Sequence, residues 1–242
     1  IFLKKNLKKI YTDLDIFFNT YNKNKNITIT GTNGKSTTAK ILYEVLRKQK
    51  KDVRLVGNIG NPILTEKKIT NKTIFVVEAS SYQLEYSKIF KSNIAVMLNI
   101  SPDHLERHKT LKNYIRAKFR LIKNQTLKDY AILNTNNFYI KQQVITQKFL
   151  PKIIKVNKQV DPVILKKINN TYFMTDGNKE NLSFVLEVIK ILKIKKEKVF
   201  KILNKFNGLI YRQQIIFRSK NLTIINDSKA TSFSASISIL KS

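Results

Sequence analysis

Nine consecutive residues, from Thr30 to Thr38, have the composition of a loop that binds phosphate groups. They read Thr-Gly-Thr-Asn-Gly-Lys-Ser-Thr-Thr. Glycines let a backbone approach phosphates closely, Lys35 can reach the terminal phosphates, and the Ser36 hydroxyl can bind a magnesium ion. A helix that starts after such a loop also favours an anion through its N–H groups and its dipole. The widespread form of the loop has a Gly where this chain has Ile29, so the alternative is a helix start that merely carries these residue types.

Polar residues that could hold a cation follow two other apolar runs. Glu78 follows the run 74–77, and His104 comes soon after the run 94–98. A carboxylate near bound phosphates is a natural ligand for Mg²⁺, and a histidine can coordinate a metal or contact a substrate. Taken alone, Glu78 could equally be a solvated residue at a strand end, and His104 a structural histidine.

Three further charged residues have roles that spacing alone does not decide. Lys118 lies in a predicted helix over 111–123, where spacing suggests an ordinary surface charge. Asp227 and Lys229 follow an apolar run. They could form a helix cap or a turn, or they could belong to a functional site.

Strands that alternate with helices must position these side chains. We expect strands at 26–30, 53–56, 74–77, 94–98 and 130–134, with helices at 39–50 and 111–123 and a lead-in helix before residue 25. This pattern predicts an α/β domain with a mainly parallel sheet, in which ligands collect at the carboxyl ends of the strands.

The second half of the chain is less regular. We expect strands at 149–156 and 172–174, a turn at 176–178, helices at 182–192 and 199–206 that stop at Asn207-Gly208, and strands at 213–217 and 222–225.

The composition limits the class of protein. The 242 residues include 46 Lys and Arg against 16 Asp and Glu, for a net charge of +30, and 42% of them are hydrophobic. Such a charge can indicate a nucleic-acid or membrane partner. Here Lys, Asn and Ile are used throughout and no nucleic-acid motif occurs, so a compositional origin is the simpler interpretation and we expect no nucleic-acid partner. The chain has no Cys, no apolar run of transmembrane length and no signal segment, and these features predict a cytoplasmic protein.

Six motifs in a fixed order resemble the Mur ligases of bacterial cell-wall synthesis. They are residues 30–38, 57–60, 78–85, 99–107, 114–118 and 226–231. The sequences Gly-Lys-Ser, Ser-Ser-Tyr-Gln-Leu-Glu and Asn-Asp-Ser-Lys-Ala-Thr favour the branch that adds D-glutamate to UDP-N-acetylmuramoyl-L-alanine.

The resemblance implies a division of the chain into three parts. Residues 1–25 would be a lead-in from an N-terminal UDP-binding domain, 26–207 the central ATP-binding domain, and 208–242 the opening of a Rossmann-like C-terminal domain. Residues 1–242 alone would then lack ligase activity.

The resemblance also implies roles for individual residues. Lys35, His104 and Lys118 would be catalytic, and Ser36, Glu78, His104 and a carbamylated Lys118 would hold two magnesium ions. The residues expected to bind ATP are Gly31, Thr32, Asn33, Gly34, Lys35, Ser36, Thr37, Asn178, Asn181, Arg212, Asp227 and Lys229. The residues expected to contact the substrates are Asn58, Ser80, His104 and Thr231. Two positions depart from the family, which commonly has His where this chain has Gly177 and Tyr211.

The implied reaction forms an amide through an acyl phosphate in peptidoglycan biosynthesis, with small-molecule substrates and a monomeric enzyme. Two alternatives stay open. One is another ligase of the superfamily, such as folylpolyglutamate synthase, and the other is a basic nucleic-acid-binding NTPase with a phosphate loop.

Overall fold

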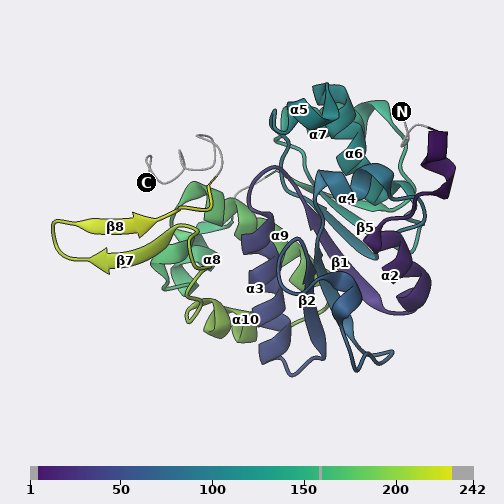
Figure 1. Cartoon of the computed structure of the whole chain (residues 1–242). Helices are drawn as coiled ribbons and strands as arrows, with labels where there is room; N and C mark the ends of the chain where they lie inside the picture. The colour runs from purple at the N-terminus through teal and green to yellow at the C-terminus, as the bar shows by residue number, and fades with distance from the viewer. Residues whose placement is uncertain (1–4, 158–159, 231–242) are drawn as a thin grey trace. The chain divides into compact units, whose positions relative to one another are not determined.

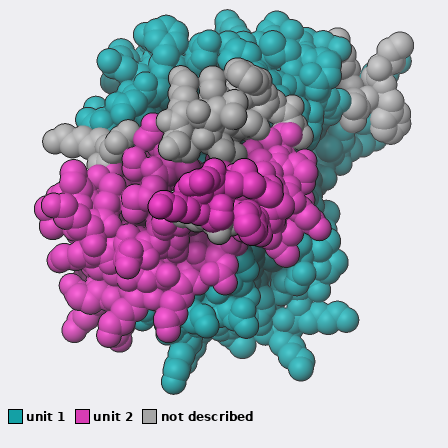
Figure 2. All heavy atoms as spheres, turned by 90° about the vertical axis from the view of Figure 1, so that its left-hand side faces the viewer, with its two compact units in different colours: residues 1–157 teal, residues 158–242 magenta. Residues whose placement is uncertain are grey.

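A computed structural model describes residues 5–157 and 160–230 of the chain. The chain divides into two compact units, residues 1–157 and 158–242, which are coloured separately in Figure 2. The two units are described separately.

The first unit alternates strands and helices along most of its length (Figure 1). Its strands are β1 (Lys25–Thr30), β2 (Val53–Gly57), β3 (Ile74–Glu78), β4 (Ile94–Met97), β5 (Tyr130–Asn134) and β6 (Lys152–Val156). Its helices are α2 (Asp13–Tyr21), α3 (Lys35–Lys48), α4 (Ser81–Tyr86), α5 (Leu105–His108), α6 (Leu111–Lys123) and α7 (Phe138–Thr146), with short 3₁₀ turns at Leu7–Lys9 and Ile63–Thr65. The predicted strands of this unit are confirmed, and the predicted helix at 39–50 begins earlier, at Lys35.

The six strands form one parallel sheet in the order β2-β3-β1-β4-β5-β6. The central strands are apolar and buried over nearly their whole length, as expected of a parallel sheet covered on both faces. Because β1 lies between β3 and β4, the ends of these three strands meet at one edge of the sheet. Thr30, Glu78 and Asn99 therefore fall on neighbouring strand ends.

Helices cover the sheet on both sides. Helix α3 packs against β1, β2 and β3 on one side, and Figure 1 shows α2 and α4 on the other. The core of that second side joins Phe17 of α2, Phe75 and Val77 of β3, and Tyr114 of α6. The rings of Phe17 and Phe75 meet edge to face at 4.7 Å. Helix α2, predicted as part of a lead-in, is thus packed into the core of the first unit.

A buried carboxylate fixes α2 to the loop that follows α4. Asp15 has no exposed surface, and its Oδ1 accepts hydrogen bonds from the Ser87 hydroxyl and from the N–H groups of Lys88, Ile89 and Phe90. Burial alone would raise the pKa of Asp15, but these hydrogen bonds outweigh it and lower the pKa. The ionised carboxylate therefore serves as an anchor between two segments far apart in the sequence.

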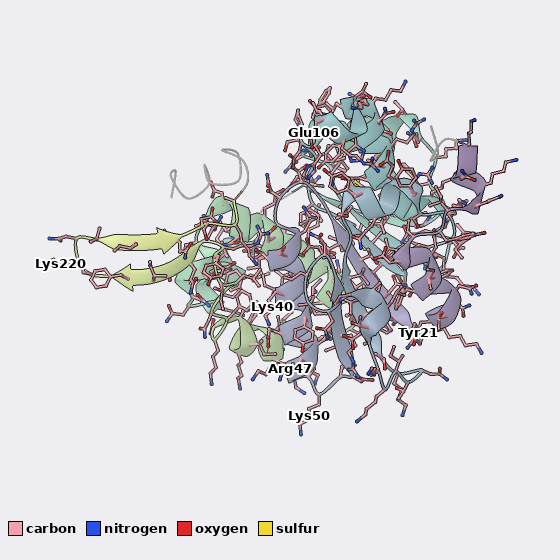
Figure 3. All side chains as sticks on the ribbon, in the orientation of Figure 1. Tyr21, Lys40, Arg47, Lys50, Glu106 and Lys220 are labelled. Atoms are coloured by element: carbon pink, nitrogen blue, oxygen red, sulfur yellow. The ribbon has the colours of Figure 1, made fainter. Side chains whose placement is uncertain are left out.

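The second unit consists of short helices and a hairpin. Its elements are α8 (Pro162–Lys167), a 3₁₀ turn (Thr171–Phe173), α9 (Asp176–Ile191), α10 (Lys196–Leu203), β7 (Gln214–Arg218) and β8 (Thr223–Asn226). Strands β7 and β8 pair antiparallel with an irregular register at Ile215–Phe217. Many of their apolar side chains are exposed, and Lys220 extends from the tip of the hairpin (Figure 3).

Two predictions for this unit are wrong. The expected strand at 172–174 is a 3₁₀ turn, because the Asn170 side-chain oxygen accepts a hydrogen bond from the N–H of Tyr172 and the Asn170 side-chain amide donates to the Leu203 and Phe206 carbonyls. The expected turn at 176–178 is the start of α9, because the Thr175 hydroxyl caps this helix at Asn178.

The predicted helix stop is displaced by a few residues. Helix α10 ends at Leu203, and Gly208 follows with φ +74°, where a Cβ would lie 2.5 Å from the Tyr172 ring. The predicted domain division at 25 and 207 differs from the compact units and stays a prediction. Within residues 5–157 and 160–230, no helix is long and apolar enough to cross a membrane.

The Asp15 anchor makes a prediction about stability. Asp15→Asn should lower the free energy of unfolding by about 2–3 kcal/mol, since charge-assisted hydrogen bonds are lost in a buried site. Because the folded-state pKa is below the unfolded value, this contribution is present above about pH 4 and fades as the pH falls. Chemical denaturation at pH 7 and pH 3 measures both effects. Asp176→Asn, at an exposed carboxylate, is the control, and an equal loss in both variants would contradict the anchor.

Candidate active site

The predicted phosphate loop connects β1 to α3 as expected. Gly34 precedes the helix with φ +82°, a left-handed conformation that glycine adopts without strain, and no side chain caps the helix start. Ser36 and Thr37 lie buried in the first turn. The first N–H groups of a helix have no partner within the helix, so this turn can receive an anion.

Neighbouring strand ends hold the loop in shape. The Asn99 side-chain oxygen accepts hydrogen bonds from the N–H groups of Thr32 (3.1 Å) and Asn33 (2.8 Å). The Thr30 hydroxyl donates to the Ala79 carbonyl beyond β3. The backbone of the loop is therefore positioned by protein groups from both adjacent strands.

Two lysines from different helices bind one carbonyl of the loop. Lys35 Nζ donates to the carbonyls of Gly31 (3.0 Å) and Thr32 (2.7 Å), and Lys118 Nζ of α6 donates to the Gly31 carbonyl at 2.7 Å. Lys118 is only 1% exposed. The spacing-based interpretation of Lys118 as a surface charge is therefore wrong, because α6 turns this residue toward the loop.

Burial changes the chemistry of the Lys118 amine. Loss of water lowers its pKa well below the ordinary value for lysine, and the charge of Lys35 lowers it further. Asp103 and Glu78 act in the opposite direction but do not reverse the shift. A neutral amine is a nucleophile, which an ordinary surface lysine at neutral pH is not.

Tyr114 lies one helical turn before Lys118 and contacts the same loop. Its hydroxyl lies 3.0 Å from the Thr32 hydroxyl, and the Lys118 amine lies 4.6 Å from the centre of its ring. Burial raises the pKa of Tyr114 to about 12, so the hydroxyl keeps its proton. Tyr114 and Asn99 were inside the motifs used for the resemblance, but no role was predicted for them. The sequence did contain a signal for Tyr114: it lies four residues before Lys118, which puts its hydroxyl on the same face of the helix.

Glu78 ends β3 with one oxygen satisfied and one not. Its Oε1 accepts a hydrogen bond from the Asn58 amide at 2.9 Å, while its buried Oε2 has no hydrogen-bond partner in the part of the chain that the structure describes. Gly57 lets the two segments approach, since a Cβ there would lie 2.3 Å from the Glu78 carbonyl oxygen. An unpartnered buried carboxylate oxygen is costly unless a cation or a donor completes it.

The residues at this site fit a hard cation held by a single carboxylate better than a metal centre with several protein ligands. The Glu78 oxygen is the kind of ligand that Mg²⁺ prefers. Among the described residues no three His, Cys, Asp or Glu side chains converge on a metal position. An amine such as that of Lys118 becomes an oxygen ligand only if it is carbamylated, so the second predicted magnesium depends on that modification.

His104 lies at the start of α5 in a left-handed conformation with φ +53°. Its partly exposed ring lies 3.5 Å from an Asp103 carboxylate oxygen and 3.8 Å from one of Glu106, which is labelled in Figure 3. The Tyr82 ring lies 5.1 Å from the His104 ring. Two carboxylates therefore flank the His104 ring.

The second histidine, His108, is buried and joins α5 to α4. Its Nε2 lies 3.0 Å from the Ser81 hydroxyl, and its ring stacks on Tyr82 at 5.6 Å. Burial lowers the pKa of His108. The predicted substrate residue Ser80 caps the same helix α4, where its hydroxyl makes local hydrogen bonds with Gln83.

The predicted nucleotide residues of the second unit form a separate group. Asn178 and Asn181 lie buried in the first turns of α9, and Asp227 follows β8. The Lys229 N–H donates to the carbonyl of Tyr211, which has φ +66°. Arg212 is half-buried beside them. Thr231 lies outside the described residues.

A parallel sheet, a glycine-containing loop between its β1 strand and the following helix, and a buried lysine at that loop define an α/β protein whose loop can receive an anion. The profile of the family "Mur ligase middle domain" matches residues 29–206, and the chain belongs to this family.

Curated relatives agree with the family. The chain is 34% identical over 250 residues to UDP-N-acetylmuramoylalanine–D-glutamate ligase of Rickettsia felis, with 96% of this chain and 55% of that protein covered. It is 33% identical over 259 residues to the ligase of the same name from Clostridioides difficile, with 99% and 57% covered. The chain thus spans little more than half the length of these relatives.

Solved structures share the fold. A MurF ligase from Thermotoga maritima, solved in complex with ADP, matches with a TM-score of 0.72 at 17% identity, covering 96% of this chain and 61% of that one. A UDP-N-acetylmuramoyl-L-alanyl-D-glutamate–2,6-diaminopimelate ligase matches with a TM-score of 0.63 at 22% identity, covering 81% and 49%. The predicted fold class is confirmed.

The lowered pKa of Lys118 makes a prediction about stability. Between the folded and unfolded pKa values, the unfolded chain binds a proton at Lys118 that the folded chain does not, so wild-type stability rises with pH. Relative to Lys118→Met, the wild type should gain up to about 1.4 kcal/mol per pH unit as the pH rises from the folded pKa toward the unfolded pKa of about 10. Chemical denaturation measures this difference. Lys123→Met, at an exposed residue of the same helix, should show no such slope, and a flat difference for Lys118→Met would contradict the buried neutral amine.

Proposed function

We propose that this chain is the nucleotide-binding part of a ligase that joins D-glutamate to UDP-N-acetylmuramoyl-L-alanine at the expense of ATP. The observation that carries the ligase chemistry is the convergence of Lys35 and the buried Lys118 on the Gly31 carbonyl. Support for the substrates comes from the names of relatives that align with nearly the whole chain. The ADP in the Thermotoga maritima ligase supports ATP as the nucleotide.

The loop would bind the phosphates of ATP. The N–H groups at the start of α3 face the anion, and Lys35 exchanges its two loop carbonyls for phosphate oxygens as charge develops on the transferred group. The substrate carboxylate attacks the terminal phosphorus, ADP leaves, and an acyl phosphate forms. The amine of D-glutamate then attacks the acyl carbon, and phosphate leaves from the tetrahedral intermediate.

Lys118 would become a carbamate. Its neutral amine attacks the carbon of CO₂, one N–H proton passes to water, and a carboxylate-like group results. The nitrogen keeps one hydrogen, so the hydrogen bond to the Gly31 carbonyl can persist. This modification converts a buried base into an anion with oxygen ligands.

Glu78 and Ser36 would hold one magnesium ion, and His104 with the carbamylated Lys118 a second. The unpartnered Oε2 of Glu78 supports the first of these sites. Bound magnesium would neutralise charge on the transferred phosphoryl group. Asn58 orients Glu78 through the amide hydrogen bond, which leaves Oε2 available.

Phosphate release by the whole protein that carries this chain tests the proposal. We expect release with ATP, UDP-N-acetylmuramoyl-L-alanine and D-glutamate together, and none when any one is omitted. Release only with a folate and L-glutamate would select folylpolyglutamate synthase instead. ATP hydrolysis that depends on RNA or DNA and weakens with salt would select the nucleic-acid-binding NTPase. The predicted monomer and cytoplasmic location stay predictions.

The carbamate makes a sharper prediction in the same assay. Lys118→Ala should lower the rate by a factor of about 100 or more, since an electrostatic group at the transferred phosphate is lost. A small carboxylate such as formate should restore part of the activity.

Lys123→Ala on the exposed face of α6 is the matched control and should keep the wild-type rate. Full activity of Lys118→Ala, or a loss that no small carboxylate relieves, would argue against the carbamate.

A further inference from the structure

Gln213 contacts predicted nucleotide-binding residues from two segments of the second unit, Asn178 at the start of α9 and Asp227 after β8. It lies between Arg212 and the start of β7, with φ +46°. No role was predicted for it from the sequence. Left-handed backbone at a residue other than glycine is uncommon and persists where surrounding contacts hold it.

The Gln213 side chain binds the start of α9. Its Oε1 accepts a hydrogen bond from the Asn178 amide at 3.0 Å and one from the Thr175 hydroxyl at 3.3 Å. Its backbone N–H donates to Asp227 Oδ1 at 3.1 Å. One residue therefore joins the start of α9 to the end of β8.

These contacts determine which end of the Asn178 amide is available. The Asn178 Nδ2 group donates to the Tyr172 carbonyl at 2.8 Å and to Gln213 Oε1 at 3.0 Å, which uses both of its hydrogens. Asn178 Oδ1 is the accepting end: it accepts a hydrogen bond from the Asn181 amide at 3.5 Å and has a second lone pair for another donor. Without Gln213 Oε1, the Asn178 amide would lose one of the two acceptors that prevent it from turning over.

Building on the proposed function and on the expectation that Asn178 binds ATP, we propose that Asn178 contacts the base of the nucleotide and that Gln213 is a positioning residue that sets the base preference through Asn178. Adenine presents an amino donor at position 6, whereas guanine presents a carbonyl acceptor there. An amide held with its oxygen as the available end favours adenine. If the amide is free to turn, it offers a donor as readily as an acceptor, and the preference for adenine falls.

Binding of ATP and GTP tests this inference without relying on turnover. Each nucleotide displaces a fluorescent ATP analogue from the whole protein in the presence of Mg²⁺. Gln213→Asn withdraws the amide by one methylene and suits left-handed backbone, so it should fold. We expect ATP affinity to fall about fivefold and the ATP-to-GTP affinity ratio to fall by a similar factor.

Two further variants separate positioning from a general structural effect. Gln213→Glu keeps the acceptor oxygens and should stay within about threefold of the wild type in both quantities. Gln214→Asn makes the same chemical change at the next residue, whose Oε1 accepts the local N–H of Tyr211, and should change neither quantity. The melting temperature of each variant is measured alongside.

Two results would overturn the inference: an unchanged ATP-to-GTP affinity ratio in Gln213→Asn, whether or not both affinities fall, or the same change of the ratio in Gln214→Asn. Failure of the proposed function is distinct, because the wild type would then bind ATP but release no phosphate with the two ligase substrates. A wild type that binds no ATP would overturn both.

Discussion

The carbonyl oxygen of Gly31 is the acceptor on which the arrangement of the first unit depends. Two amines reach it, one from α3 within the loop and one from α6 across the sheet edge. A peptide oxygen has two lone pairs, so both bonds can form at once. The second bond requires α6 to lie with one face against the loop, and Tyr114, four residues before Lys118, contacts Thr32 from that same face. Helix α6 is therefore part of the phosphate loop's support.

This arrangement places two ionisable groups, the Lys118 amine and the Glu78 carboxylate, where water cannot solvate them. The Lys118 amine is almost wholly buried, and burial together with the neighbouring Lys35 lowers its pKa. At the same strand ends, Glu78 keeps a buried oxygen without a hydrogen-bond partner among the described residues. A site with a reactive amine and an unsatisfied carboxylate is unfavourable for folding alone, and such costs are typical of sites that bind ions or substrates.

In the second unit, the contacts between predicted nucleotide-binding residues are made mainly by side-chain amides. Asn178, Gln213 and Asp227 are joined by hydrogen bonds between the start of α9 and the base of the β7–β8 hairpin. The family match ends at residue 206, so it includes Asn178 but neither Gln213 nor Asp227. The role proposed for Gln213 comes instead from its hydrogen bonds to residues 35 and 14 positions away in the chain.

The sequence by itself determined the parallel α/β fold of the first unit, the phosphate loop and the order of the family motifs. These depend on local signals: apolar runs, glycines at a strand-to-helix turn, and helix boundaries such as those of α6, which were predicted to the residue. Local signals failed where a distant group decided the outcome, as at 172–174, where Asn170 caps a turn and binds carbonyls over thirty residues away. Only the tertiary structure showed that Lys118 is buried with a lowered pKa, gave roles to Tyr114 and Asn99, and led to the role proposed for Gln213. The physical reason is that a pKa shift, an unsatisfied oxygen and an amide's orientation all depend on which groups fill the surrounding space, and sequence spacing does not specify them.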